Sequence, residues 1–366
     1  MNRVLFPPNA LNLQIYKKYN QTLRRLLEQW WDKICTSKKI AEHAGELEAY
    51  RQSLQAGDLT LLGLITDGGQ GLATADNGRF VGAIAGSTVA ARIMQTRPVK
   101  FLEAIQKNRI SSLKHITGLN EAREYLAALG EAETRELFDK LKAKYGRDIF
   151  GQGYLYRIVS PDEIAEVEKL TEKEKEKGIG PGKPHFVPYD KGDKEGNRWF
   201  LQTPFYIDWS KENVAYLSSS PRARWQGYNF FFREGFCWTD VNSTYLKCRM
   251  KTNGVHDVLS MSLFSQCRLT PDWYLVCLIN SKYISEFVDD FLNNTSHFQI
   301  NDARQLPIII PNQQQLQDFE SLFNQAYGIK VRQFSGELSE PDALYELEQV
   351  QKRLDEMVYR LYDIEL

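Results

Sequence analysis

The sequence predicts an α+β protein in which a β-rich domain, interrupted by a helical insertion, is flanked by N-terminal and C-terminal helices. Two observations support this fold class. Apolar residues recur every three or four positions in residues 11–57, 99–177 and 345–366, and this spacing is typical of amphipathic helices. Residues 186–283 are instead rich in aromatic side chains and are broken by turn-forming residues, which indicates short strands.

The composition excludes several classes of protein. A chain of 366 residues with 42% hydrophobic side chains can bury a core large enough for two or three sub-domains. Its formal net charge is −1, so any nucleic-acid surface has to be a local basic patch.

The five cysteines form no C-x-x-C pair and have no metal-ligand spacing with the five histidines. We therefore expect reduced thiols, no metal site and a cytoplasmic location. No signal peptide is visible and no apolar run approaches the roughly 18 residues of a membrane span, so no membrane partner is expected.

Residues 1–57 are predicted to form a helical connector. Its apolar stripe consists of Leu23, Leu26, Leu27, Trp30 and Ile34. The Trp30-Trp31 pair requires a surface that covers it, either in the rest of this chain or in a separate protein. Core packing is the favoured interpretation, because large aromatic side chains are usually buried.

Residues 58–98 are predicted to open the β-rich domain with a hairpin. The run Leu61–Ile65 is apolar enough for a buried strand, and the glycines that follow it allow a tight loop. Asn77-Gly78 is a strong hairpin-turn dipeptide. An ordinary hairpin is one interpretation; the other is a loop whose side chains reach a phosphate or a base edge. The candidate side chains are Gln70, Thr74, Asn77 and Arg79.

Residues 99–180 are predicted to form the helical insertion. The segment Val99–Gly178 holds 15 acidic and 15 basic side chains. Such a balance is typical of a solvated helical surface rather than of a DNA-binding one. We therefore expect no nucleic-acid contact from this segment.

Residues 181–310 are predicted to form the main part of the β-rich domain, and they contain the best candidate binding surface. Arginine and lysine neutralise phosphates, arginine also pairs with guanine, and asparagine and tyrosine read or position bases. The residues of these types are Arg222, Arg224, Tyr228, Asn229, Arg233, Lys247, Arg249 and Lys251. For the neighbouring aromatic residues we expect ordinary packing in a sheet. These are Phe230, Phe232, Phe236 and Trp238.

Residues 311–366 are predicted to form a C-terminal helical spacer or docking segment. They carry 5 basic and 11 acidic side chains, a net charge of 5 − 11 = −6. We expect this end of the molecule to face away from any nucleic acid.

Several segments resemble one family of DNA-modifying enzymes. They include GQGLATADNGRF (69–80), SSSPRARWQGYNFFFREGFCWTDVNS (218–243) and the pair LINS (278–281) and LPIIIPNQQQL (306–316). These segments resemble the target-recognition region of N6-adenine DNA methyltransferases of type II and type IIG restriction systems, including the bacteriophage-exclusion methyltransferases. The last pair is also similar to the recognition domains of type I specificity subunits. The resemblance implies sequence-specific recognition of double-stranded DNA in a restriction-modification system that defends against phage, with DNA contacts from the basic and polar residues named above.

The catalytic half of such an enzyme is missing from this sequence. An adenine methyltransferase of this group needs an [ND]-P-P-[YF] tetrapeptide, which holds the flipped base, and a glycine-rich S-adenosylmethionine loop. Neither motif is present. We therefore expect no catalytic residue and no cofactor in this chain, and S-adenosylmethionine bound by a partner methyltransferase domain or subunit. Two alternatives stay open: a divergent but complete methyltransferase or nuclease, and a protein-interaction module on the same scaffold.

Overall fold

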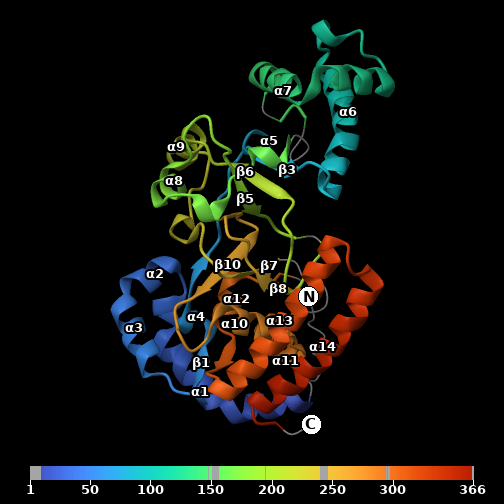
Figure 1. The fold of residues 1–366 in the computed structure, drawn as a ribbon. Coiled ribbons are helices and arrows are strands. Elements are labelled where there is room, and N and C mark those ends of the chain that lie inside the picture. The colour runs from blue at the N-terminus through green and yellow to red at the C-terminus, as the bar shows by residue number, and fades with distance from the viewer. Residues whose placement is uncertain are drawn as a thin grey trace, which may run out of the picture.

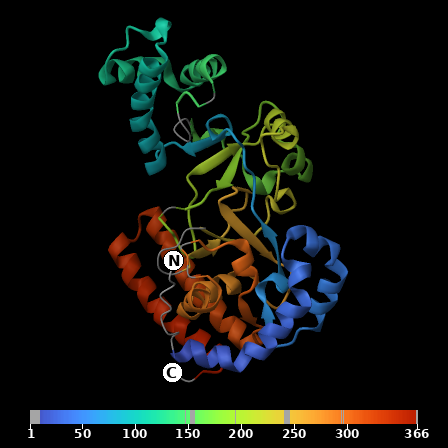
Figure 2. The same cartoon turned by 180° about the vertical axis from the view of Figure 1, so that it is seen from behind.

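The computed structural model describes residues 10–146, 148–150, 156–193, 195–239, 246–293, 295 and 297–364. It confirms the predicted α+β class. The described chain is elongated and has three parts: a lower body of helices around small sheets, an upper sheet, and a helical arm that projects from the upper sheet (Figure 1). The view from behind shows the same parts in the same order (Figure 2).

The lower body contains two small antiparallel sheets. One has the strand order β2-β10-β7-β8, and the other pairs β1 with β11. The strands are β1 (Leu59–Leu61), β2 (Thr66–Gly69), β7 (Phe236–Thr239), β8 (Cys248–Met250), β10 (Ser260–Ser265) and β11 (Pro307–Ile309). Both sheets therefore join an N-terminal segment to segments from the second half of the chain.

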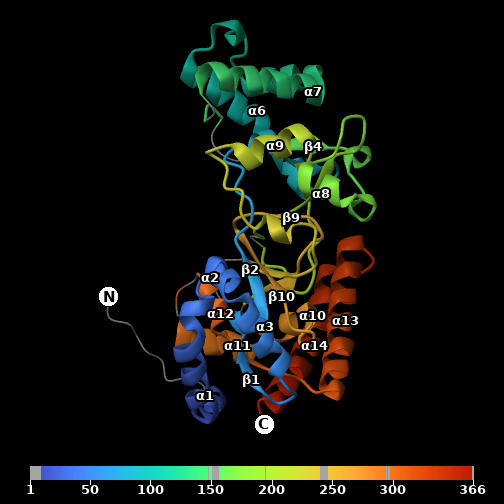
Figure 3. The same ribbon diagram turned by 90° about the vertical axis from the view of Figure 1, so that its left-hand side faces the viewer.

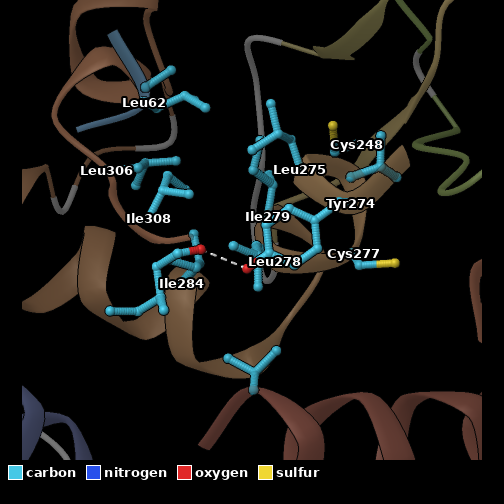
Figure 4. Packing of buried hydrophobic residues seen from close by; sticks show 14 of the residues in the cluster. Leu62, Cys248, Tyr274, Leu275, Cys277, Leu278, Ile279, Ile284, Leu306 and Ile308 are labelled. Atoms are coloured by element: carbon cyan, nitrogen blue, oxygen red, sulfur yellow. Dashed lines mark hydrogen bonds between the residues drawn. The ribbon is translucent and has the colours of Figure 1, made fainter. Parts of the chain in front are cut away.

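Helices surround these two sheets and complete the core of the lower body. They are α1 (Ala10–Ile34), α2 (Ser37–Glu42), α3 (Ala44–Ser53), α4 (Leu62–Ile65), α10 (Asp272–Ile279), α11 (Lys282–Phe287), α12 (Ile300–Arg304), α13 (Gln313–Ser335) and α14 (Glu340–Leu361), with a π-helical turn at Val288–Leu292. Helix α10 is apolar on every side and is fully buried from Tyr274 to Ile279, as Figure 4 shows. A helix of this kind lies at the centre of a core. Trp30 of α1 lies in the same core and packs against Tyr50, with ring centroids 5.2 Å apart.

The upper sheet has five strands in the order β4-β3-β6-β5-β9. They are β3 (Val81–Ile84), β4 (Arg157–Val159), β5 (Phe186–Asp190), β6 (Phe205–Asp208) and β9 (Val255–His256). Two helices, α8 (Glu172–Lys177) and α9 (Lys211–Ser219), lie beside this sheet, together with 3₁₀ turns at Pro161–Glu163, Val167–Lys169 and Tyr228–Phe230 (Figure 3). The chain passes directly from β9 into β10, so the upper sheet and the lower body meet at this point.

The helical arm consists of α6 (Thr88–Asn108) and α7 (Leu119–Tyr145), linked through a 3₁₀ turn at Ser111–Leu113. The arm has its own apolar core, which includes Phe101, Ile105, Phe138 and Leu141. At its base, buried Arg97 donates to both carboxylate oxygens of Glu131, at 2.6 and 3.0 Å, and to the Tyr156 carbonyl at 2.7 Å. Glu131 also accepts from the backbone amide of Ile158 in β4 at 2.9 Å. This network holds the arm against the edge strand of the upper sheet.

The arm differs in extent from the predicted insertion at 99–180. Its first helix already begins at Thr88, and residues 157–180 return to the upper sheet and the turns beside it. Within the described ranges, no helix is both long and apolar enough to cross a bilayer.

The predicted opening hairpin is wrong. Strand β2 pairs with β10, whereas β3 pairs with β4 and β6, so β2 and β3 lie in different sheets. The residues expected to form the first strand contain the helical turn α4, and those expected to form the β-turn begin the helical turn α5 (Asn77–Phe80). A type I′ hairpin turn needs positive φ at both central residues, and neither Asn77 nor Gly78 has it. Gly68 serves close packing instead, because a Cβ there would collide with the Ser262 carbonyl.

Candidate nucleic-acid interface

Two loops that are far apart in the sequence lie side by side above the lower body. We call residues 70–79 the first loop, residues 222–229 the second loop, and both together the paired loops. The Ala73 amide donates to the Arg224 carbonyl at 3.2 Å, and the Arg224 amide donates to the Ala73 carbonyl at 2.9 Å. The Gln226 side chain also donates to the Gln70 side-chain oxygen at 3.4 Å. Antiparallel pairing therefore joins the two segments that carry most of the predicted DNA contacts.

Glycines allow the first loop to pack closely against His256 of β9 and against the second loop. The Leu72 amide donates to the His256 carbonyl at 2.8 Å, and a Cβ on Gly71 would collide with that carbonyl. Gly227 has a left-handed backbone with φ of 71°, and a Cβ there would lie 2.8 Å from the Gln70 carbonyl oxygen. Both positions therefore exclude larger side chains.

The polar side chains of the first loop have two different roles. Thr74 is buried, donates to the side-chain oxygen of Asn77 at 2.6 Å and accepts from the Asp76 amide at 3.3 Å. Thr74 therefore shapes the loop rather than presenting its hydroxyl to a ligand. Arg79 is exposed, and its guanidinium lies 4.3 Å from the ring centroid of Tyr216 and 4.8 Å from that of Phe80. Such stacking fixes the guanidinium plane while its N–H groups stay accessible.

A broad cleft separates the paired loops from the helical arm. Its volume is about 1010 Å³. The paired loops contribute Ala75 and Arg222, and the arm contributes Lys107, Asn108, Lys142, Tyr145, Gly146, Asp148 and Ile149. Lys142 also forms an ion pair with Asp76 of the first loop at 3.4 Å. Cationic side chains therefore lie on both walls of this cleft.

Lys107 and Lys142 of the arm were not predicted as part of the interface. The even charge balance of the arm suggested a neutral solvated surface. In the structure, however, several acidic side chains are engaged within the arm or at its base. Glu121 accepts from the Thr117 hydroxyl and from the amides at the start of α7, and Glu131 pairs with Arg97. Lys107 and Lys142 therefore reach the cleft, where Asp148 also lines the wall and Asp76 pairs with Lys142.

The structure brings together eight of the predicted contact residues on the paired loops. These are Gln70, Thr74, Asn77, Arg79, Arg222, Arg224, Tyr228 and Asn229. All but Thr74 and Asn77 are exposed, and Asn77 is half-buried.

Two other predicted contact residues lie outside the paired loops. Arg233 is exposed, but its guanidinium packs over Phe230 at 5.2 Å and Phe264 at 5.8 Å. Lys247 is half-buried, and its ammonium group lies 2.6 Å from the position that a Cβ on Gly196 would occupy. These two cations therefore belong to different surfaces from the cleft.

The predictions for Arg249 and Lys251 are wrong, because both side chains are buried. Arg249 is 1% exposed and donates to the equally buried carboxylate of Asp190 at 3.0 Å. The Lys251 ammonium donates to the carbonyls of Arg233, Thr252 and Gly254 at 2.9–3.1 Å. Burial lowers the pKa of Lys251 to about 8. Both cations stabilise the junction between the lower body and the upper sheet, and neither can reach DNA.

One cysteine lies beside a carboxylate in the core. Cys237 is fully buried beside Asp190, and burial raises the pKa of its thiol to about 12, so it is not a nucleophile at neutral pH. Among the residues that the structure describes, no group of three or more histidine, cysteine, aspartate or glutamate side chains could hold a metal ion. Comparison with protein-family models and with curated proteins finds no match to this chain.

Proposed function

We propose that this chain recognises a specific site in double-stranded DNA for a restriction-modification system and positions an adenine methyltransferase module over it. The observation that carries the proposal is the pairing of Ala73 with Arg224. It joins the two segments that resemble the target-recognition region of adenine methyltransferases, and it places their exposed arginines beside a cleft with lysines on its opposite wall.

The side chains of this surface suit the two tasks of a recognition domain. Lys107 and Arg222 line the cleft and would neutralise phosphates, whereas Lys142 is already paired with Asp76. The amide groups of Gln70 and Asn229 would read base edges, and each bidentate contact contributes about 1–3 kcal/mol of discrimination. The chemical step belongs to a partner domain or subunit that binds S-adenosylmethionine, because the sequence has no [ND]-P-P-[YF] motif.

The first test is duplex binding by a double variant. Arg222→Ala with Arg224→Ala removes two exposed guanidinium groups from the second loop, so we expect at least a tenfold weaker Kd at low salt and a logarithmic salt slope lower by about 2. Fluorescence anisotropy with a labelled mixed-sequence duplex measures both quantities. Selection from a randomised duplex pool then identifies the target site.

Lys352→Ala with Arg353→Ala is the matched control, because both residues are exposed cations on α14 in the lower body. At 0.15 M salt, where screening acts over about 8 Å, this pair should leave the affinity unchanged. Equal affinity of the Arg222/Arg224 variant and the unmodified protein at low salt would remove the paired loops from the proposal. Binding of S-adenosylmethionine by this chain alone would instead favour a divergent complete methyltransferase.

A further inference from the structure

Three aromatic rings form a continuous stack that ends on the surface of the paired loops. We call Trp209, Trp225 and Tyr228 the aromatic stack. The rings of Trp209 and Trp225 are 5.7 Å apart and inclined by 14°, and those of Trp225 and Tyr228 are 6.5 Å apart and inclined by 18°. Trp209 is fully buried, Trp225 is half-buried and Tyr228 is 54% exposed. The stack therefore runs from the core of the upper sheet to solvent.

The inner end of the aromatic stack is held firmly. The indole N–H of Trp209 donates to the Lys175 carbonyl at 3.0 Å, and Phe231 packs edge-on against both tryptophans. Gly227 places the next residue at the start of a 3₁₀ turn through its left-handed backbone. The ring of Tyr228 is consequently positioned before any ligand arrives, and ordering it on binding costs little conformational entropy.

The surroundings of Tyr228 indicate the chemistry of its ligand. Arg222 and Arg224 precede it on the same loop and are exposed, Asn229 follows it, and Gln70 lies across the pairing. A planar ring attached to phosphate groups fits a flat aromatic face bordered by cations and amides.

We propose that Tyr228 stacks against a base that has left its place in the duplex, so that the base extends the aromatic stack by one ring. This inference rests on the proposed function and adds a substrate property, which is that the recognised DNA is locally unstacked. In a regular duplex both faces of each base are covered by neighbouring bases. Stacking on Tyr228 therefore requires an opened base step, as with other side chains that wedge into DNA.

The consequence is a preference for DNA in which one base is already loosely held. A mismatched base leaves the stack at a smaller free-energy cost than a paired one. We expect the protein to bind a mixed-sequence duplex with one central mismatch about tenfold more tightly than the same duplex fully paired, because a difference of about 1.4 kcal/mol in the cost of opening the base corresponds to a tenfold change.

Tyr228→Ala should abolish this preference, because it weakens binding to the mismatched duplex more than binding to the paired duplex. Tyr228→Phe, which retains the ring, should keep the preference, whereas Tyr228→Leu should lose it. Because Tyr228 is more than half exposed, these variants should fold, and thermal unfolding checks this. Tyr345→Ala is the matched control, since Tyr345 is 66% exposed on α14.

The outcomes separate this inference from the proposed function. Two results would overturn the stacking role of Tyr228: equal affinity of the unmodified protein for the mismatched and paired duplexes, or an unchanged preference in Tyr228→Ala. In either case, salt-dependent binding to the duplexes would still support DNA recognition. Failure of the unmodified protein to bind either duplex would overturn both. Arg222→Ala with Arg224→Ala should weaken binding to both duplexes equally and keep their ratio, because it removes charge and leaves the aromatic stack intact.

Discussion

At the residue scale, His256 of β9 is a buried histidine directly beneath the paired loops. Its imidazole is fully buried, with Phe231 and Phe264 ring centroids 5.3 and 5.9 Å away. Neither ring nitrogen has a hydrogen-bond partner among the described residues. Burial, together with the positive charge of Lys251, lowers the pKa of His256 well below its usual range. The folded protein therefore holds this imidazole in its neutral form.

This burial predicts a stability that depends on pH. In the unfolded chain His256 takes up a proton below its ordinary pKa of about 6.5, whereas in the folded state it does not. The contribution of His256 to stability is therefore complete above about pH 6.5 and is lost as the pH falls, by up to about 1.4 kcal/mol per pH unit. His256→Leu should remove this part of the acid sensitivity. Urea unfolding between about pH 7.5 and 5 measures it.

The decisive quantity is the difference in unfolding free energy between His256→Leu and the unmodified protein. As the pH falls, His256→Leu should become more stable relative to the unmodified protein. His115→Leu, at an exposed histidine, is the matched control. A difference that stays constant over this range would show that folded His256 accepts a proton as readily as the unfolded chain does.

Single residues also mark the limit of what the sequence could predict about the interface. Arg222 and Arg249 look alike in the sequence, since each lies among aromatic and polar residues of a β-prone segment. Arg249 is buried because β8 lies at the junction of two sheets, where Asp190 from β5 neutralises it. A local pattern contains no information about a partner that distant in the chain. The exposed loop arginines were predictable because they follow a serine- and proline-containing turn.

At the element scale, helices were predicted correctly where apolar residues recur with strong helical periodicity. The prediction failed where a local turn signal conflicted with tertiary packing. Helices α1 and α14 occupy the N-terminal and C-terminal segments that their apolar spacing indicates. The Asn-Gly signal failed because β2 finds its partner in β10, about two hundred positions along the chain, rather than in the strand that follows. Pairing between distant strands is a tertiary property that no short window contains.

The base of the helical arm provides a prediction at the element scale. Arg97→Met removes the cation that joins α6 to Glu131 and to the Tyr156 carbonyl. Breaking a buried ion pair on one side costs about 3 kcal/mol, so the arm should open locally more often. Amide hydrogen exchange should accelerate in residues 100–145 and remain slow in α10 at the centre of the lower body.

Arg92→Met is the matched control, because Arg92 lies on the same helix with its side chain exposed. It should leave the exchange pattern unchanged. Acceleration of equal size in the arm and in α10 would mean that the network stabilises the whole chain, and the arm would then not be a separate cooperative unit.

At the scale of the whole molecule, the acidic charge is concentrated in the C-terminal helices. Residues 311–366 carry a net charge of −6. The N-terminal segment 1–57 carries 9 − 5 = +4, so it offsets much of this charge within the lower body. Helices α13 and α14 lie in the lower body (Figure 1), away from the residues that line the cleft. This polarity means that the acidic side chains of α13 and α14 act on a polyanion at the cleft only over a long range.

This polarity predicts an effect of salt on a variant far from the cleft. Glu320→Gln with Glu348→Gln removes two exposed negative charges from α13 and α14. Because screening acts over about 8 Å at 0.15 M salt and about 30 Å at 0.01 M, duplex affinity should rise severalfold only at the lower concentration. Anisotropy titrations at both concentrations measure this, with Gln349→Ala as the uncharged control. A similar rise at 0.15 M would place the acidic helices in contact with DNA.

The arm enters and leaves the upper sheet at neighbouring points. Strand β3 ends at Ile84, β4 begins at Arg157, and the two strands lie parallel to each other. Among the described residues, the two helices of the arm lie outside the sheet and contact it mainly at their base. An arm of different length can therefore replace them at a small cost in loop-closure entropy. New binding preferences can then evolve by substitution of a module, without remodelling the scaffold that carries it.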